Sequence, residues 1–201
     1  MIRNYRDLTR LEMEQVNKDE TIVLIPLGAL EQHGNQAPLG TDDIIAEAMT
    51  DYIRRELEGG PSSEDSDFPM LVFPVIPIGL STEHRNFCGS ITLKPDTYYH
   101  MLYDISTSLV HHGFKKLAFL VCHGGNAPIV QVLSRELRSE FGISPFILSS
   151  GAFSHPDVTA TISVGKYLGL PWRRDGNLHG HGRGPVPGKV RYLRGRNSNC
   201  I

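Results

Sequence analysis

Apolar and polar positions divide this chain into short apolar runs that are separated by amphipathic segments. Short continuous apolar runs are typical of strands that are buried on both faces of a sheet. Pro74 and Pro77 place one of these runs at a sheet edge or make it irregular, because proline donates no backbone hydrogen bond. The runs predict four strands, at residues 21–27, 70–79, 117–122 and 145–149.

Apolar residues between these runs recur three and four residues apart, which predicts helices. The N-terminal residues 1–16 are helical in pattern as well. Strands and helices in alternation predict an α/β domain whose largely parallel sheet is covered on both faces. Three main helices are expected: from Asp42 to Gly59, from Pro95 to Gly113, and, with Asn126 as its cap, up to Gly142.

Length and composition are those of one globular domain. The 201 residues are 40% hydrophobic and 21% charged, and the formal net charge is −2, so nothing overall indicates a nucleic-acid or anionic-membrane partner. No run approaches the eighteen apolar residues of a membrane span, and the charged N-terminus lacks the apolar region of a secretory signal. Three cysteines without a CxxC spacing predict a reducing, cytoplasmic setting.

Polar clusters directly follow three of the predicted strands: "GALEQHG", "GLSTEHRN" and "CHGGN". Ligands bind beyond the carboxyl ends of strands in open parallel sheets, so these clusters should meet at one rim. Glu31 and His33 point the same way in extended backbone. Asp42 comes where a helix begins, and His123 comes from a neighbouring strand. Two carboxylates and two imidazoles suit zinc, manganese or iron(II).

Several of these residues also have a purely structural interpretation. Asp42 is a common residue type at a helix start. Glu83 and His84 could pair with each other on a loop. Cys122 beside His123 suggests a thiol hydrolase, although a cysteine that ends a buried strand usually belongs to the core.

Four blocks, taken in order, resemble the creatininase (creatinine amidohydrolase) family. They are "PLGALEQHGNQAPLGTDDIIAEAM", "GLSTEHRNFCGSITL", "GFKKLAFLVCHGGN" and "GNLHGH". The resemblance runs from the expected first helix to His181. It implies a three-layer α/β/α sandwich with a largely parallel, mixed sheet. It also implies a two-metal site and hydrolysis of non-peptide C–N bonds in small-molecule amides, often by a homohexamer.

The resemblance also implies residue roles. Glu31 resembles a ligand of one metal, His33 a ligand of the other, and Asp42 the bridging carboxylate. His123 matches the ligand that completes the first metal's set, and His181 resembles the histidine that transfers a proton near the substrate. Bridged metals generate hydroxide and polarise the amide carbonyl, while the histidine protonates the leaving nitrogen. Candidates for the substrate pocket are Glu83, His84 and Asn126.

The resemblance stops at His181. Residues 182–201 are rich in Gly, Arg and Pro and contain five cationic and no acidic residues. Gly184 stands where the family's C-terminal motif has a glutamate that completes the second metal, so an incomplete second site is expected. We therefore expect a domain at 1–181 that lacks its C-terminal part and a non-family tail at 182–201. The tail is either the product of a frame shift or alternative exon, or a genuine terminus that binds an acidic partner.

The sequence thus predicts a creatininase-like, metal-dependent hydrolase of non-peptide amide bonds, cyclic ones included, with activity impaired by the missing glutamate. The alternative from another class is a catalytically inactive binding or assembly subunit that keeps the fold. A thiol hydrolase would instead be sensitive to alkylation and indifferent to chelators. Creatinine, a formamide-bearing nucleotide precursor and a short peptide are the substrate classes that the resemblance leaves open.

Overall fold

The computed structural model describes residues 2–59 and 69–150. The alternation of strands and helices that the apolar pattern predicts is confirmed. His181, Gly184 and the tail at 182–201 lie outside the described residues. The elements, in chain order, are β1 (Ile2–Asn4), a 3-10 helix (Tyr5–Asp7), α1 (Arg10–Glu14), β2 (Ile22–Leu27), α2 (Thr41–Gly59), β3 (Met70–Val72), a 3-10 helix (Thr82–His84), α3 (Pro95–His111), β4 (Lys116–Val121), a 3-10 helix (Gly124–Asn126), α4 (Ala127–Phe141) and β5 (Phe146–Ser149).

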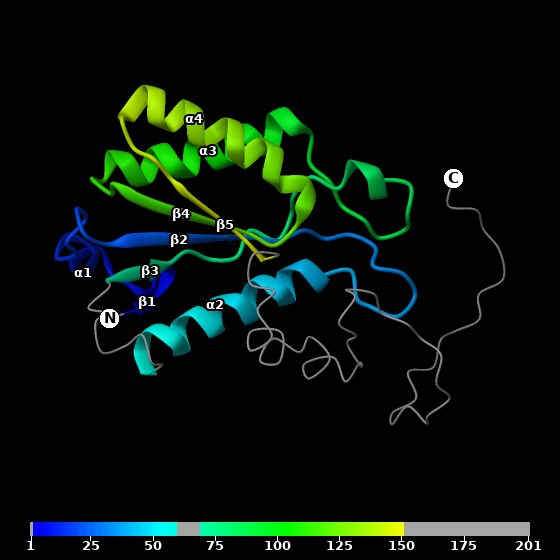
Figure 1. Ribbon diagram of the computed structural model, residues 1–201, viewed down its shortest axis with the longest axis horizontal. Helices are drawn as coiled ribbons and strands as arrows, with labels where there is room; N and C mark the ends of the chain where they lie inside the picture. Colours follow the sequence, from blue (N-terminus) through cyan, green and yellow to red (C-terminus); the bar gives the residue numbers. More distant parts are fainter. Residues whose placement is uncertain (1, 60–68, 151–201) are drawn as a thin grey trace.

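The strands form one sheet in the order β1-β3-β2-β4-β5, and each neighbouring pair is parallel. Helix α2 covers one face of the sheet, whereas α3 and α4 cover the other (Figure 1). The predicted three-layer α/β/α architecture is therefore confirmed. Within the described ranges, antiparallel pairing is confined to a bridge between Leu30 and Ile91.

Two apolar clusters, one on each face of the sheet, join the three layers. Successive side chains of a strand point to opposite faces. Val23, Ile25 and Leu27 accordingly belong to the cluster formed with α3 and α4, whereas Leu24 belongs to the cluster formed with α2. All four side chains are at most 1% exposed. Burial of each contributes about 1.5–3 kcal/mol, so β2 is held firmly from both sides.

The N-terminus differs from its predicted helix. Ile2–Asn4 form β1, which pairs with β3 in parallel, and the helical part is limited to a 3-10 helix at Tyr5–Asp7 and the α-helix at Arg10–Glu14. Thr9 and Glu12 form a capping box at its start. The helical prediction is therefore wrong for the first residues, because pairing with the open side of β3 overrides the local pattern.

The proline-containing run is shorter than predicted and does not lie at an edge. Its regular part, Met70–Val72, lies between β1 and β2. Pro74 and Pro77 follow this part, where the chain is irregular and pairs with β2 again through an isolated bridge between Leu27 and Ile76. The predicted irregularity is confirmed, whereas the edge position is taken by β1.

Candidate metal centre

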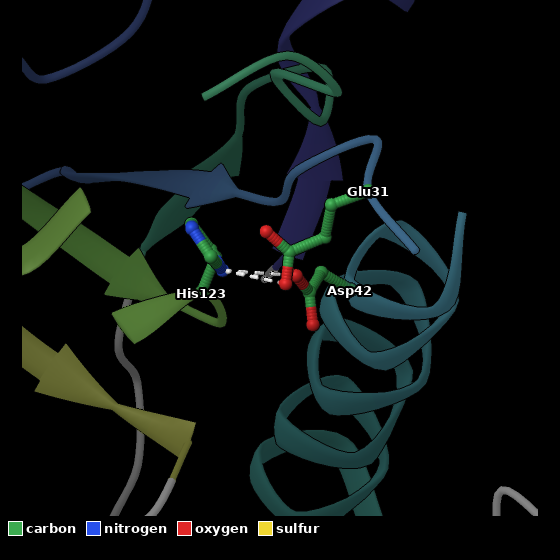
Figure 2. A group of neighbouring side chains, drawn as sticks. All are labelled: Glu31, Asp42 and His123. Carbon is green, nitrogen blue, oxygen red and sulfur yellow. Dashed lines mark ion pairs between the residues drawn. The ribbon is translucent and has the colours of Figure 1, made fainter. Parts of the chain in front are cut away.

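The carboxyl ends of the central strands bring three predicted ligands together. Glu31 follows β2, Asp42 lies in the first turn of α2, and His123 follows β4 (Figure 2). Their exposed fractions are only 4%, 5% and 6%. A charged group that is so deeply buried requires a partner of opposite charge or a metal.

The spacing of the ligand atoms fits a metal ion. His123 Nδ1 lies 3.1 Å from Asp42 Oδ2 and 3.5 Å from Glu31 Oε1. A tetrahedral zinc ion with bonds of 2.0–2.1 Å sets its ligand atoms about 3.3 Å apart. One oxygen or nitrogen from each of the three residues lies within 4.8 Å of the others.

The tautomer of His123 also favours a metal. Its Nε2 donates a hydrogen bond to the Leu80 carbonyl at 2.6 Å, so a neutral ring has a lone pair on Nδ1. This lone pair faces both carboxylates. Glu31 Oε2 and Asp42 Oδ2 are buried and accept no hydrogen bond within the described residues. Such an arrangement is repulsive until a cation or a proton lies between the groups.

In the absence of a metal, a proton takes this position. Burial by itself would lower the pKa of His123, but the Asp42 carboxylate, the Leu80 carbonyl and Glu31 outweigh it and raise the pKa to about 9. Burial by itself would raise the pKa of Asp42, because it disfavours the charged carboxylate. Hydrogen bonds from His123 and His33 instead hold the pKa of that carboxyl below its ordinary value. The site therefore attracts positive charge strongly.

His33 approaches Asp42 from the other side. Its Nδ1 donates to the Glu31 carbonyl at 3.2 Å, and its Nε2 lies 3.4 Å from Asp42 Oδ1. The Asp42 carboxylate raises the pKa of His33 despite the burial of the ring. Asp42 thus presents Oδ1 to His33 and Oδ2 to His123, which is the geometry that a bridging carboxylate requires.

The loop after β3 brings the next two candidates to Glu31, where His84 approaches the same oxygen as His123. His84 Nε2 lies 3.6 Å from Glu31 Oε1. Glu83 is exposed, and its Oε2 accepts a hydrogen bond from the Thr82 hydroxyl at 3.4 Å. Ligand atoms of Glu31, Glu83 and His84 also lie within 4.8 Å of one another. His84 thus approaches Glu31, and the alternative in which it pairs only with Glu83 on a loop does not account for this contact.

Asn126 does not cap α4 through its side chain, contrary to the prediction. It is fully buried; its Oδ1 accepts from the Leu80 amide and its Nδ2 donates to the Gly28 carbonyl, both at 2.9 Å. Asn126 thereby joins the segments that follow β2 and β3, and it holds the backbone amide of Leu80, the residue whose carbonyl orients His123. Both polar atoms of its side chain are engaged inside the protein, so contact with a substrate stays a prediction.

Two residues at the centre were missed by sequence reasoning. Gln32, within the "LEQHG" motif, contacts His84, and Leu80 acts only through its backbone. A backbone carbonyl has no sequence signature of its own. The signal that could have found it is the glycine in "CHGGN", because a Cβ on Gly125 would lie 2.1 Å from the Leu80 oxygen.

The thiol-hydrolase alternative is disfavoured by the surroundings of Cys122. Its side chain is 7% exposed and belongs to the core cluster under α2. Burial, together with the charges of Asp42 and Asp43, raises the pKa of the thiol to about 12. The reactive thiolate is therefore strongly disfavoured near neutral pH.

The fold and this cluster define an α/β domain with a candidate metal centre at the carboxyl rim of its sheet. The sequence profile of the creatininase family, described as creatinine amidohydrolase, matches residues 6–181. The chain belongs to this family, which confirms the resemblance of its motifs. No helix within the described ranges is long and apolar enough to cross a membrane.

Curated relatives carry two different names. A mycofactocin precursor peptide peptidase of Mycobacterium ulcerans (strain Agy99) is 33% identical over 118 residues, which are 59% of this chain and 46% of the relative. A creatinine amidohydrolase of Pseudomonas putida is 25% identical over 142 residues, 66% of this chain and 50% of the relative. The chain thus spans about half the length of these relatives.

Solved creatininase structures share the fold. A creatininase with a tryptophan-to-phenylalanine substitution has a TM-score of 0.61 at 25% identity, over 79% of this chain and 64% of that one. A structure described as "Creatininase Mn" has a TM-score of 0.58 at 22% identity, over 78% and 61%. A variant of the "Zn-Zn type" has a TM-score of 0.57 at 24% identity, over 79% and 62%. Manganese and zinc are thus named for the neighbours.

Proposed function

We propose that this chain is a metal-dependent hydrolase of amide C–N bonds. The observation that carries the proposal is the cluster of Glu31, Asp42 and His123, whose buried lone pairs converge without a proton between them when His123 is neutral. The printed names of the relatives, an amidohydrolase and a peptidase, both denote hydrolysis of a C–N bond. We take the domain to extend over residues 1–181.

The ligand set divides between two divalent ions. Glu31, Asp42 and His123 would hold the first, and His33 with the other oxygen of Asp42 would hold the second. Carboxylate oxygens and imidazole nitrogens suit zinc, manganese and iron(II). When bound, such a pair of ions lowers the pKa of a water molecule and polarises the amide carbonyl.

The protein's own residues prepare and complete the reaction. The Leu80 carbonyl holds His123, and the Glu31 carbonyl holds His33, so each ring keeps its lone pair on the nitrogen that faces Asp42. The departing nitrogen of an amide must be protonated because an amide anion is a very poor leaving group. We assign this protonation to His181, while Glu83 and His84 line the side from which the substrate approaches.

The second site is the weaker one. Gly184 offers no carboxylate, so only His33 and Asp42 would hold the second ion. We expect weak amidohydrolase activity that excess metal increases. Gly184 also favours the alternative function, a catalytically inactive binding or assembly subunit. A small-molecule amide substrate, homo-oligomeric assembly and a cytoplasmic location belong to the same proposal.

Metal content and turnover test the proposal together. The full chain, dialysed against trace zinc or manganese, is expected to retain one ion per chain and to hydrolyse at least one amide among creatinine, a formamide and a short peptide. A chelator should abolish turnover, whereas thiol alkylation should not. Absence of metal and turnover in a folded protein would indicate the inactive subunit, and sensitivity to alkylation without sensitivity to chelators would indicate the thiol hydrolase.

A further inference from the structure

Gln32 and His84 form a hydrogen-bonded pair beside Glu31 that the ligand set does not use. Gln32 Oε1 accepts a hydrogen bond from the Gly34 amide at 3.0 Å. Gln32 Nε2 lies 2.9 Å from His84 Nδ1. The side chain of Gln32 therefore spans from its own loop to the loop that follows β3.

These two contacts determine which nitrogen of His84 carries the proton. A backbone N–H can only donate, so the oxygen of the Gln32 amide must face Gly34. The amide nitrogen then faces His84 and can only donate as well. His84 Nδ1 is consequently the acceptor, and the proton of the neutral ring lies on Nε2.

His84 differs from the other two histidines at the centre in the group that its ring turns toward the carboxylates. His33 and His123 each donate their ring proton to a backbone carbonyl and turn a lone pair toward Asp42. His84 turns an N–H toward Glu31, with Nε2 3.6 Å from Oε1. A shift of about 0.5 Å would bring this contact to hydrogen-bond length.

Two further contacts hold His84 in place, one at its backbone and one at its ring. Its backbone amide donates to the Ser81 carbonyl at 3.0 Å, and Phe87 packs edge-on against the ring with 5.9 Å between centroids. Its side chain is 29% exposed, so the ring lies at the mouth of the centre rather than in the core. Rotation away from Glu31 would break the contact with Gln32.

We propose that His84 is a positioning residue for the metal ligand Glu31, with Gln32 holding the ring in its Nε2–H tautomer. The inference rests on the proposed function, because it takes Glu31 as a metal ligand. Hydrogen bonds to ligating carboxylates fix their orientation and typically change metal affinity 10- to 100-fold. His84 itself does not bind the metal.

The competing arrangement is a cation bound by Glu31, Glu83 and His84, whose ligand atoms also lie close together. Ligation through Nε2 would require the ring proton to move to Nδ1. The amide of Gln32 would then have to turn over, which would set its NH₂ group against the Gly34 N–H. The two arrangements therefore differ in the tautomer of His84 as well as in the number of metal ions bound per chain.

Nitrogen-15 long-range correlation spectra of the full chain distinguish them. In the neutral ring of His84 we expect the proton on Nε2, both without and with zinc. His100 provides an internal reference for the other tautomer, because its Nδ1 donates to the Asp96 carbonyl at 2.7 Å. Gln32→Leu should remove the preference of His84 while leaving His100 unchanged. A switch of His84 to Nδ1–H on zinc addition would overturn the proposal.

Zinc titrations with His84 variants give the second measurement. His84→Leu should weaken zinc binding about 10- to 100-fold, whereas His84→Gln, which retains an N–H donor, should restore much of the affinity. Glu83→Gln should change neither affinity nor stoichiometry. Loss of one zinc ion in both Glu83→Gln and His84→Gln would show that these residues are ligands. If the wild-type chain bound no zinc, the proposed function would fail. The tautomer of His84 in the metal-free protein would still show whether Gln32 holds the ring in its Nε2–H form.

Discussion

The carbonyl oxygen of Leu80 accepts the Nε2 proton of His123 at 2.6 Å, and this contact turns the lone pair of the ring toward the carboxylates. Leu80 lies in the irregular segment after β3, and His123 lies at the end of β4. The two segments are not adjacent in the sheet, because β2 lies between β3 and β4. The orientation of a ligand that follows β4 thus depends on a backbone oxygen in the segment that follows β3.

Substitution of Asp42 should affect both metals, because its two oxygens face different histidines. We expect Asp42→Ala to abolish binding at both sites, whereas His33→Ala should spare the first site. Metal analysis of protein in equilibrium with excess zinc, which also fills the weaker second site, provides the measurement. Equal, partial losses in the two variants would contradict a bridging role for Asp42.

Gly125 should not tolerate a side chain. A Cβ there would lie 2.1 Å from the Leu80 oxygen and 2.5 Å from His123 Nε2, so Gly125→Ala must displace the contact between them. We expect a loss of stability of about 1–3 kcal/mol and weaker zinc binding, measured by denaturant unfolding and calorimetry. Gly124→Ala is the matched control, because a Cβ there meets nothing within 4 Å. Equal behaviour of the two variants would argue against the contact.

The raised pKa of His123 predicts a pH dependence of the metal-free protein. The folded pKa is about 9, above an unfolded value of about 6.5, so the folded state binds the proton more tightly. The resulting stabilisation is fully present below about pH 6.5 and is lost as the pH rises through 9. Its size is at most about 3 kcal/mol. Urea unfolding between these limits should show the decline. His123→Leu should reduce it, and the part that remains should come from His33, whose pKa is raised as well.

Metal uptake should release the same proton. Zinc replaces the proton on His123 Nδ1, so zinc affinity should increase with pH and level off above about 9. Calorimetric titrations in buffers of different ionisation enthalpy measure the number of protons released. At about pH 7.5 we expect close to one proton per first-site ion. A value near zero would mean that His123 is already neutral when the metal arrives.

The architecture and the meeting of polar clusters could be predicted because both follow from local patterns. Apolar runs identify central strands such as β2 and β4, and parallel strands carry their carboxyl ends to one rim. β1 could not be predicted in this way, because it is only three residues long, Ile2–Asn4, and its structure depends on pairing with β3 far along the chain.

The role of Asn126 shows a different limit. An asparagine beside the start of a helix predicts a cap on local grounds. The side chain instead bonds to Leu80 and Gly28, which become its neighbours only when the sheet forms. A Cβ on Gly79 would lie 2.2 Å from Asn126 Oδ1. The glycine before Leu80 is therefore the sequence feature that reflects this packing.

The central position of β2 has a consequence for exchange of the bound ion. β2 pairs over its whole length with β4, and β4 pairs in turn with β5, so both strands lie inside the described sheet. Backbone amides in such strands are protected until the molecule unfolds as a whole. Glu31 and His123 follow these two strands, so an ion would leave the native protein through side-chain rotation at the rim. Its residence time would then be set by local motion and not by the rate of global unfolding.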